Sequence, residues 1–289
     1  MKPSFAERLN AWLDERTGLR DALRRALDTA LPGGPRWRYV FGSVLLALVG
    51  VEVITGLAML TVYAPGAQTA WASTFYLQHV LPWGGIVRAM HHWASHALVV
   101  TVGAHTLQVL VAGGHRRPRE VNWWIGLALA GLILGFAITG FPLAWDQRGY
   151  WVSRVETGIM GSVPVLGPYI QRFLQGGNQY GTLTLTRFFT LHTFVLPALM
   201  ALFVGVHLAL FRKHGVTPPA NAAEAPADES SARWWPSQAV RDALAALVAV
   251  GLVVGIARAK GVWLDAPADA QSNYPARPEW FFMPLSQLL

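Results

Sequence analysis

Five segments of the chain are long and apolar enough to cross a lipid bilayer, which leaves few folds open to it. They lie at roughly 40–63, 90–112, 123–143, 188–211 and 239–257. A hydrocarbon core about 30 Å thick is crossed by about 20 apolar residues in a helix. Only 13% of the residues are charged, against about 25% in soluble domains. The sequence therefore predicts an all-α membrane protein, with a four-helix transmembrane bundle and at least one further transmembrane helix.

Basic residues gather at alternate ends of these spans. Of the 23 Lys and Arg residues, 15 lie before residue 40, within 113–120 or within 212–241. By the positive-inside rule these regions face the cytoplasm, the n side, and the C-terminus lies across the membrane on the p side. We expect a multi-pass protein of a bacterial inner membrane with a cytoplasmic N-terminus. The same rule accounts for the net charge of +7, so membrane lipid is an expected partner and nucleic acid is not.

A stretch rich in Pro, Ala, Ser and acidic residues, PPANAAEAPADESSAR at 218–233, predicts a flexible linker. It divides an N-terminal four-helix domain, 1–217, from a C-terminal domain, 234–289, that holds the fifth helix. The loop at 143–187 is long and patterned, and such loops are usually functional. The first 30 residues show no signal peptide and favour either an interfacial or a solvated helix.

Two of the spans carry a pair of histidines at nearly the same interval. His91 and His105 are 14 residues apart, and His192 and His207 are 15 apart. At a helical rise of about 1.5 Å per residue, each pair spans about 21–22 Å and returns to nearly the same face. A lone histidine in a span is often a packing residue. Two matched pairs instead predict two levels of facing imidazoles.

Glycines in the first and third spans repeat the 14-residue interval: Gly42 and Gly56, then Gly126 and Gly140. Since the spans alternate in direction, Gly56 and Gly140 share a depth with His91 and His192, and Gly42 and Gly126 share one with His105 and His207. Glycines often only permit helix packing. Here they leave room for two flat macrocycles whose metal the histidines bind from both faces. The absence of cysteine excludes covalent heme attachment.

These residues resemble the cytochrome b of bc-type quinol-oxidising complexes. The likeness lies in RAMHHW, RFFTLHTFVLP, GVHLALFRKHG, GGHRRPREVNWWIG, ITGFPLAWDQRGYW and PVLGPYI. The 15-residue histidine interval and the linker near 220 are similar to the chloroplast-type branch. In that branch a separate subunit follows, and here we expect its start to be fused to the C-terminus of this chain. Val40 occupies the position at which that branch has a heme-attaching cysteine, so a covalent third heme is not expected, while a noncovalent one stays open.

The resemblance implies two bis-histidine b hemes bound noncovalently and two quinone sites. Quinol at the p-side site gives one electron to a Rieske iron–sulfur protein. The other passes through both hemes to quinone at the n-side site, with proton translocation. The implied enzyme is a quinol:cytochrome c oxidoreductase, or one with a plastocyanin-like acceptor. The implied partners are the Rieske protein, a c-type cytochrome and a second copy of the complex.

The quinol-site signature of the family, Pro-Glu-Trp-Tyr, is similar to Pro278-Glu279-Trp280-Phe281, which lacks the tyrosine hydroxyl. The resemblance assigns Glu279 the catalytic role of accepting a quinol proton; a snorkelling interfacial acid is the alternative. Tyr150 and Gly158, in the matching loop, are assigned to the same site.

The resemblance also assigns residues around the two hemes and the n-side quinone. Arg88 would pair with propionates of the p-side heme and Arg119 with those of the n-side heme, although a positive-inside role also explains Arg119. Arg212 would lie near the n-side quinone, or act as a simple snorkelling anchor, and Asp28 is a weaker candidate there.

Three further ionisable residues lie inside the spans. Glu52 could serve a proton route or hydrogen-bond a heme edge, and a structural hydrogen bond is the favoured alternative, because the family has an amide there. His92 and His96 lie off the ligand face and could contact propionates, surround the site or simply pack.

Two rival functions remain. One is a diheme cytochrome b that anchors a dehydrogenase or hydrogenase and exchanges electrons with quinone. The other is a membrane scaffold without catalysis. The family continues through further helices after Pro-Glu-Trp, whereas this chain stops at PLSQLL. We expect either a fragment or a further membrane subunit that supplies those helices.

Overall fold

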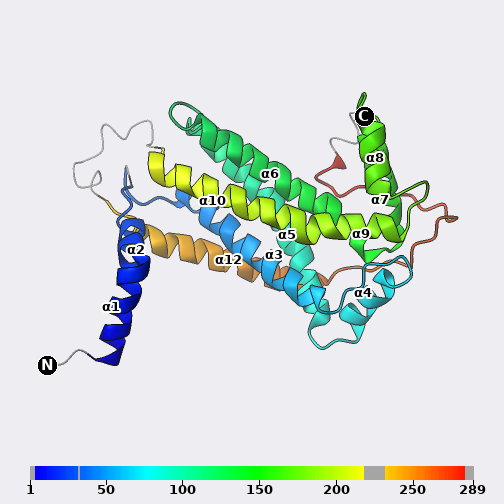
Figure 1. Ribbon diagram of the computed structural model, residues 1–289, viewed down its shortest axis with the longest axis horizontal. Helices are drawn as coiled ribbons and strands as arrows, with labels where there is room; N and C mark the ends of the chain where they lie inside the picture. Colours follow the sequence, from blue (N-terminus) through cyan, green and yellow to red (C-terminus); the bar gives the residue numbers. More distant parts are fainter. Residues whose placement is uncertain (1–3, 32, 218–231, 284–289) are drawn as a thin grey trace.

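The chain forms an elongated bundle of long helices with a cluster of shorter helices at one end (Figure 1). The computed structural model describes residues 4–31, 33–217 and 232–283. Most of the predicted linker, 218–233, lies outside the described residues. Within them the only extended pairings are two isolated bridges, Ala30 with Arg233 and Asp146 with Pro267. The predicted all-α class is confirmed.

All five predicted spans are helices, and among the described residues they are the ones whose length and apolarity allow them to cross a membrane. They are α3 (Phe41–Leu60), α5 (Gly84–Val111), α6 (Glu120–Gly140), a helix running through α9 and η3 into α10 (Leu196–His214), and α12 (Ser237–Lys260). The second and fourth helices begin six residues earlier than predicted, at the end of the bundle that carries the short helices. The first residues of each helix are too polar to be recognised from hydropathy.

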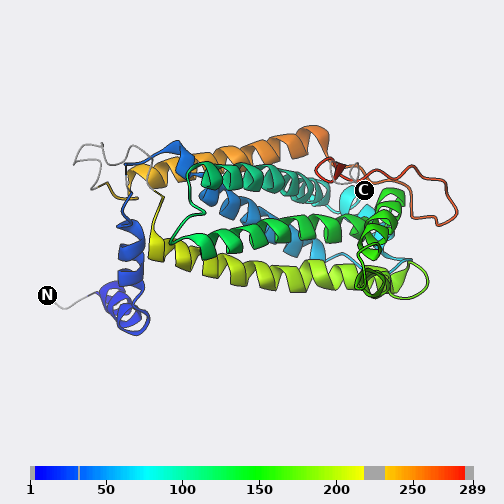
Figure 2. The same ribbon diagram turned by 90° about the horizontal axis from the view of Figure 1, so that it is seen from above.

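The long helices pack in chain order, and α12 completes the bundle. Helix α3 packs on α5, α5 on α6, and α6 on α10, while α12 lies against α3 and α5. Figure 2 shows α12 (orange) along one side and α10 (yellow-green) along the opposite side. The buried core draws on all five spans: Val44, Leu48, Ala94, Leu98, Ile133, Met200 and Val253. The fifth helix thus shares one apolar core with the first four.

The two ends of the bundle differ. One end, called the α2 end, carries α1 (Phe5–Thr17) and α2 (Leu19–Leu27), which project from the bundle. Ser4 and Glu7 cap α1 reciprocally, and hydrogen bonds from Ser4 lower the pKa of Glu7. The apolar residues of α1 are exposed, among them Phe5 and Trp12. The predicted interfacial placement of this helix stays a prediction.

The opposite end, called the α7 end, holds most of the irregular chain. It carries α4 (Ala70–His79), η2 (Phe141–Ala144), α7 (Gln147–Gly161), α8 (Gly167–Gln175) and α9 (Thr182–Thr190), together with residues 261–283 (Figure 1). The long loop expected at 143–187 is therefore largely helical. A short 3-10 turn, η1 (Trp37–Tyr39), precedes α3 at the α2 end.

Candidate functional site

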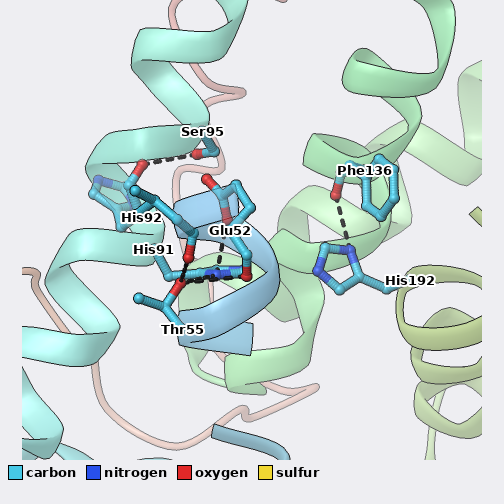
Figure 3. A network of polar contacts seen from close by, with 8 residues as sticks. Glu52, Thr55, His91, His92, Ser95, Phe136 and His192 are labelled. Atoms are coloured by element: carbon cyan, nitrogen blue, oxygen red, sulfur yellow. Dashed lines mark hydrogen bonds and ion pairs between the residues drawn. The ribbon is translucent and has the colours of Figure 1, made fainter. Parts of the chain in front are cut away.

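Two histidine side chains from different helices face each other near the α7 end. His91 lies in α5 and His192 in the turn that precedes α10, and their ring centres are 6.1 Å apart with planes inclined by 66° (Figure 3). Each ring uses Nδ1 for contacts with neighbouring protein groups, which leaves Nε2 for a ligand. Two metal–imidazole bonds of about 2 Å on opposite sides of one metal, plus the ring radii, account for such a separation.

The sequence Ile-Thr-Gly occurs in α3 as residues 54–56 and in α6 as residues 138–140, and both copies hold one of these histidines. Thr55 Oγ1 lies 2.9 Å from Nδ1 of His91, and Thr139 Oγ1 lies 3.2 Å from Nδ1 of His192. Each hydroxyl donates its proton to a carbonyl in its own helix, so it is left to accept a hydrogen bond from the imidazole. Sequence reasoning overlooked this repeat.

The glycine of each copy makes room for the imidazole ring. A Cβ added at Gly140 would lie 2.5 Å from Cε1 of His192, and one at Gly56 would lie 3.4 Å from Cε1 of His91. Gly126 stands in the same relation to His207, also at 3.4 Å. Nothing lies within 4 Å of such an atom at Gly42. Three of the four predicted glycines therefore face a predicted histidine at the predicted depth.

A π-helical turn, η3 (Leu191–Val195), places His192. Pro197, in the first turn of α10, lacks the N–H that would bond to the carbonyl four residues earlier, and its ring crowds that carbonyl. Such a position widens a helix locally, and π turns are frequent at functional sites. Nδ1 of His192 then lies 3.1 Å from the carbonyl oxygen of Phe136 (Figure 3).

The second pair, His105 and His207, lies nearer the α2 end. The two side chains are close enough to interact electrostatically, and the backbone of Asn122 lies beside His207. Neither Nδ1 has a side-chain hydrogen-bond partner among the described residues. In sequence, Leu48, Leu98, Ile133 and Met200 of the core fall between the two histidine levels, so an apolar layer separates them.

The two histidine levels suit a metal ion whose other ligands belong to a bound cofactor and not to the protein. Within the described part of the chain no three His, Cys, Asp or Glu side chains group closely enough to hold a metal ion. Two facing imidazoles supply only two ligands, on opposite sides. The arrangement suits a planar macrocycle with a central iron and not a bare ion.

The two arginines assigned to heme propionates tie helix ends together. Arg88 donates to the side-chain oxygen of Gln78 and to the carbonyl of Trp263. Arg119 donates to the carbonyl of His214 at 2.9 Å, joining the start of α6 to the end of α10. Each lies at the bundle end expected of it, and the propionate contacts stay predictions.

A second cluster lies at the α7 end, where residues 261–283 fold back over the bundle. The Glu279 carboxylate lies 3.1 Å from Nη2 of Arg148 and 3.9 Å from Nε2 of His96. Nε1 of Trp280 donates to Nδ1 of His96 at 2.9 Å. Because an indole N–H only donates, Nδ1 must accept, and a neutral His96 carries its proton on Nε2, the nitrogen that faces Glu279.

The folded-back segment is anchored by backbone contacts to the start of α7. The N–H of Ala268 donates to the carbonyl of Trp145 at 3.1 Å, and the N–H of Gln147 donates to that of Ala266 at 2.8 Å. Asp146 Oδ2 accepts from the N–H of Asp265. These bonds join the chain after α12 to the predicted functional loop.

The other residues assigned to quinone sites are distributed as follows. Phe281 packs near His96, with ring centres 5.6 Å apart, and Pro278 is half-buried in the same segment. Tyr150 is buried in α7 against Trp145, and Gly158 is exposed on the same helix.

The two n-side candidates lie at the opposite end of the bundle. Arg212 is exposed in the last turn of α10. Asp28 is an exposed residue at the C-terminus of α2, and its carbonyl accepts a hydrogen bond from Arg233. Their roles at a quinone stay predictions.

Sequence reasoning missed Glu156 and did not predict that His96 lies beside Glu279. Oε2 of Glu156 is buried in α7 with no hydrogen-bond partner among the described residues. Burial, and then the charge of Glu279, raise the pKa of Glu156 to about 8. A carboxyl group within GYWVSRVETG, residues 149–158 of the long patterned loop, was the available signal.

The structure thus defines a helical membrane bundle with a facing histidine pair, His91 and His192, and a second pair, His105 and His207, nearer the α2 end. The Glu279 cluster lies at the α7 end. The family model described as "Cytochrome b(N-terminal)/b6/petB" matches residues 96–267. Cytochrome b6 of Prochlorococcus marinus (strain NATL1A) is 34% identical over 208 residues, covering 72% of this chain and 95% of that protein. Cytochrome b6 of Synechococcus sp. (strain RCC307) is 35% identical with the same coverage.

A solved chain described as "Hyperthermophilic respiratory Complex III" has the same fold. Its TM-score is 0.85 at 23% sequence identity, covering 96% of this chain and 75% of that chain. The chain belongs to the cytochrome b/b6 family and is a multi-pass membrane protein, which confirms the resemblance drawn from its sequence.

Proposed function

We propose that this chain is the diheme cytochrome b subunit of a bc-type, quinol-oxidising complex. The observation that carries the proposal is the pair of histidine levels, with His91 and His192 set 6.1 Å apart for one metal between them. The family membership supports b-type hemes, and the lack of cysteine agrees with noncovalent binding.

Bound hemes would supply one-electron transfer, and the residues of this chain would hold and separate them. His91 and His192 would ligate one heme, and His105 and His207 the other. Thr55 and Thr139 would fix the orientation of their histidines by accepting from Nδ1. The apolar layer between the levels would keep the two hemes in a low dielectric, which shapes their potentials.

Quinol oxidation releases two electrons and two protons, and Glu279 is the group proposed to accept one of those protons. Its carboxylate pairs with Arg148 at 3.1 Å and lies 3.9 Å from His96, at the bundle end that carries the first histidine level. A carboxylate that is positioned and partly exposed to a polar cluster can take a proton and release it. One electron would enter the His91–His192 level and continue to quinone near the α2 end, with proton translocation.

The family and the Complex III fold support an assembly with several subunits. A Rieske iron–sulfur protein would take the other electron and a c-type cytochrome or plastocyanin-like acceptor would follow. We also propose a homodimer of the complex, membrane lipid contacts and a further membrane subunit. The fused C-terminal part, 234–289, would supply the helix α12 and the Pro-Glu-Trp-Phe segment.

The alternative is a diheme cytochrome b that anchors a dehydrogenase or hydrogenase. Such a conduit needs the two histidine levels and has no need of the cluster of Glu279, Arg148 and His96. The ordered contacts of Glu279 and Trp280 with His96 favour the quinol-splitting function.

Purification from the native membrane tests the proposal. We expect two b hemes per polypeptide, a co-purifying iron–sulfur protein and quinol-dependent reduction of a c-type cytochrome. A preparation that binds one heme, or none, would exclude the diheme assignment. Two hemes with an associated dehydrogenase and no iron–sulfur partner would establish the alternative.

A further inference from the structure

Glu52 makes the closest polar contact of any group with a proposed heme ligand. Its Oε2 lies 2.8 Å from Nδ1 of His91, and both side chains are largely buried, at 16% and 22% exposure (Figure 3). The other carboxylate oxygen, Oε1, has no hydrogen-bond partner among the described residues. The carboxylate therefore interacts mainly with this one imidazole.

Comparison of the two Ile-Thr-Gly copies shows that only one of the two histidines at this level, His91, contacts a carboxylate. Glu52 precedes the glycine of the first Ile-Thr-Gly by four residues, and Phe136 precedes the glycine of the second by four. On the Phe136 side, Nδ1 of His192 meets a neutral carbonyl oxygen at 3.1 Å. The two ligands of one level therefore differ, one facing a carboxylate and the other a peptide group.

The other level has no such carboxylate in the part of the chain that is described. Nδ1 of His105 and of His207 have no side-chain hydrogen-bond partner there. Of the four proposed ligands, His91 alone is thus paired with an acidic side chain among the described residues. The asymmetry distinguishes the two levels along the bundle.

The chemistry of a metal-bound imidazole predicts the sign of the effect that this contact has on the reduction potential of the iron. When Nε2 binds iron, Nδ1 carries a proton and donates it. A carboxylate is a stronger acceptor than a hydroxyl or carbonyl oxygen, and charge-assisted hydrogen bonds are about twice as strong as neutral ones. A carboxylate partner makes the ligand more basic. A more basic ligand stabilises the oxidised, more positive iron and lowers its reduction potential.

We propose that Glu52 is a positioning residue that lowers the potential of the heme at the His91–His192 level relative to the other heme. The inference rests on the proposed function, since it requires both hemes. It gives electron flow a direction, because an electron entering at the α7 end then passes energetically downhill toward the His105–His207 level.

The test is a potentiometric titration of both b hemes in the purified complex, comparing wild type with E52Q. The amide keeps the shape and removes the charge. In E52Q we expect the equilibrium constant for reduction of the heme at the His91–His192 level to rise about tenfold. This is a rise in potential of about 59 mV for one electron. The other heme is an internal reference and should not move. A change below about threefold, or an equal change at both hemes, would overturn the proposal.

Two further variants separate charge from packing. T55V removes the neutral acceptor beside the same Nδ1 and should shift the potential by less than about threefold; a shift equal to that of E52Q would exclude the carboxylate as the cause. E52D withdraws the carboxylate by one methylene and should raise the equilibrium constant by at least about threefold. It decides the question if E52Q does not retain heme, because an unchanged potential in E52D would overturn the proposal.

The outcome is distinct from a failure of the proposed function. If the wild-type protein contains no b heme, the diheme assignment fails, and with it the inference about Glu52 that rests on it. If two hemes titrate normally in wild type and E52Q moves neither, only the role of Glu52 is lost.

Discussion

His91 and His192 face each other with ring centres 6.1 Å apart, held by matching Thr-Gly pairs on two other helices. Four helices therefore cooperate to build a single level. His105 and His207 form the second level, closer to the α2 end, with the apolar core between. This repetition is the structural basis of the proposed electron path.

Replacing either histidine of one level should remove one heme and leave the other. H192L is expected to reduce the heme content from two to one, because a single axial imidazole does not hold the iron from both sides. H207L should remove the opposite heme and serves as the matched control. Heme content and redox difference spectra of the purified variants measure this. Both hemes retained in H192L would contradict the two-level assignment.

Gly140 should tolerate no side chain. In G140A the new Cβ would lie 2.5 Å from Cε1 of His192, so the ring must move and the heme at this level should be lost or weakened. G131A in the same helix is the control, since nothing lies within 4 Å of a Cβ there. The ratio of the two hemes in each variant is the measurement. Equal heme content in both variants would show that the ring can shift freely.

E279Q should slow quinol oxidation while leaving both hemes in place. General acid–base groups typically contribute about 10²–10⁴-fold, so we expect a loss of at least about tenfold in turnover. E120Q, which removes an acid on the surface of α6 away from this cluster, is the control. Steady-state quinol:cytochrome c reduction measures the effect. Unchanged turnover in E279Q would remove the proposed role of this residue.

Glu156 should make stability fall as pH rises. Its pKa is about 8 in the folded protein, raised by burial and then by Glu279, against about 4.3 in an unfolded chain. Between these values the folded state binds more protons, so the free energy of unfolding decreases with increasing pH. Below about pH 4.3 and above about pH 8 the contribution is constant.

The matched variant for this effect is E156Q, which cannot titrate. We expect the unfolding midpoint of wild type to fall between pH 5.5 and pH 8 by about 2 °C or more beyond the fall seen in E156Q. Thermal unfolding in detergent at both pH values measures it. Parallel behaviour of the two proteins would show that Glu156 is ionised when folded.

The sequence was sufficient to predict the spans and the histidine register, because hydropathy and a 14- or 15-residue interval depend on local chain geometry alone. It did not predict the π turn at His192, although Pro197 is the cue, nor the Ile-Thr-Gly repeat that orients the rings. It gave no basis for pairing Glu52 with His91, since that contact joins α3 to α5.

The carboxylate cluster was only half predicted. Glu279 was singled out from the resemblance, while its neighbours Arg148 and His96 come from distant segments. Those contacts depend on the path of residues 261–283 back over α7, which is fixed by backbone bonds to Trp145 and Gln147. Backbone hydrogen bonds of this kind do not depend on side-chain identity, so they cannot be predicted from a pattern in the sequence.

The most direct test of the account is a pulse of oxidant given to native membranes that contain quinol, with the quinone-reducing site near the α2 end inhibited. Absorbance of the b hemes is followed in time. If quinol electrons are split at the Glu279 cluster, the b hemes become transiently more reduced when oxidant is added. If the b hemes only become oxidised, the chain is a linear electron conduit and the bc-type function proposed for it is wrong.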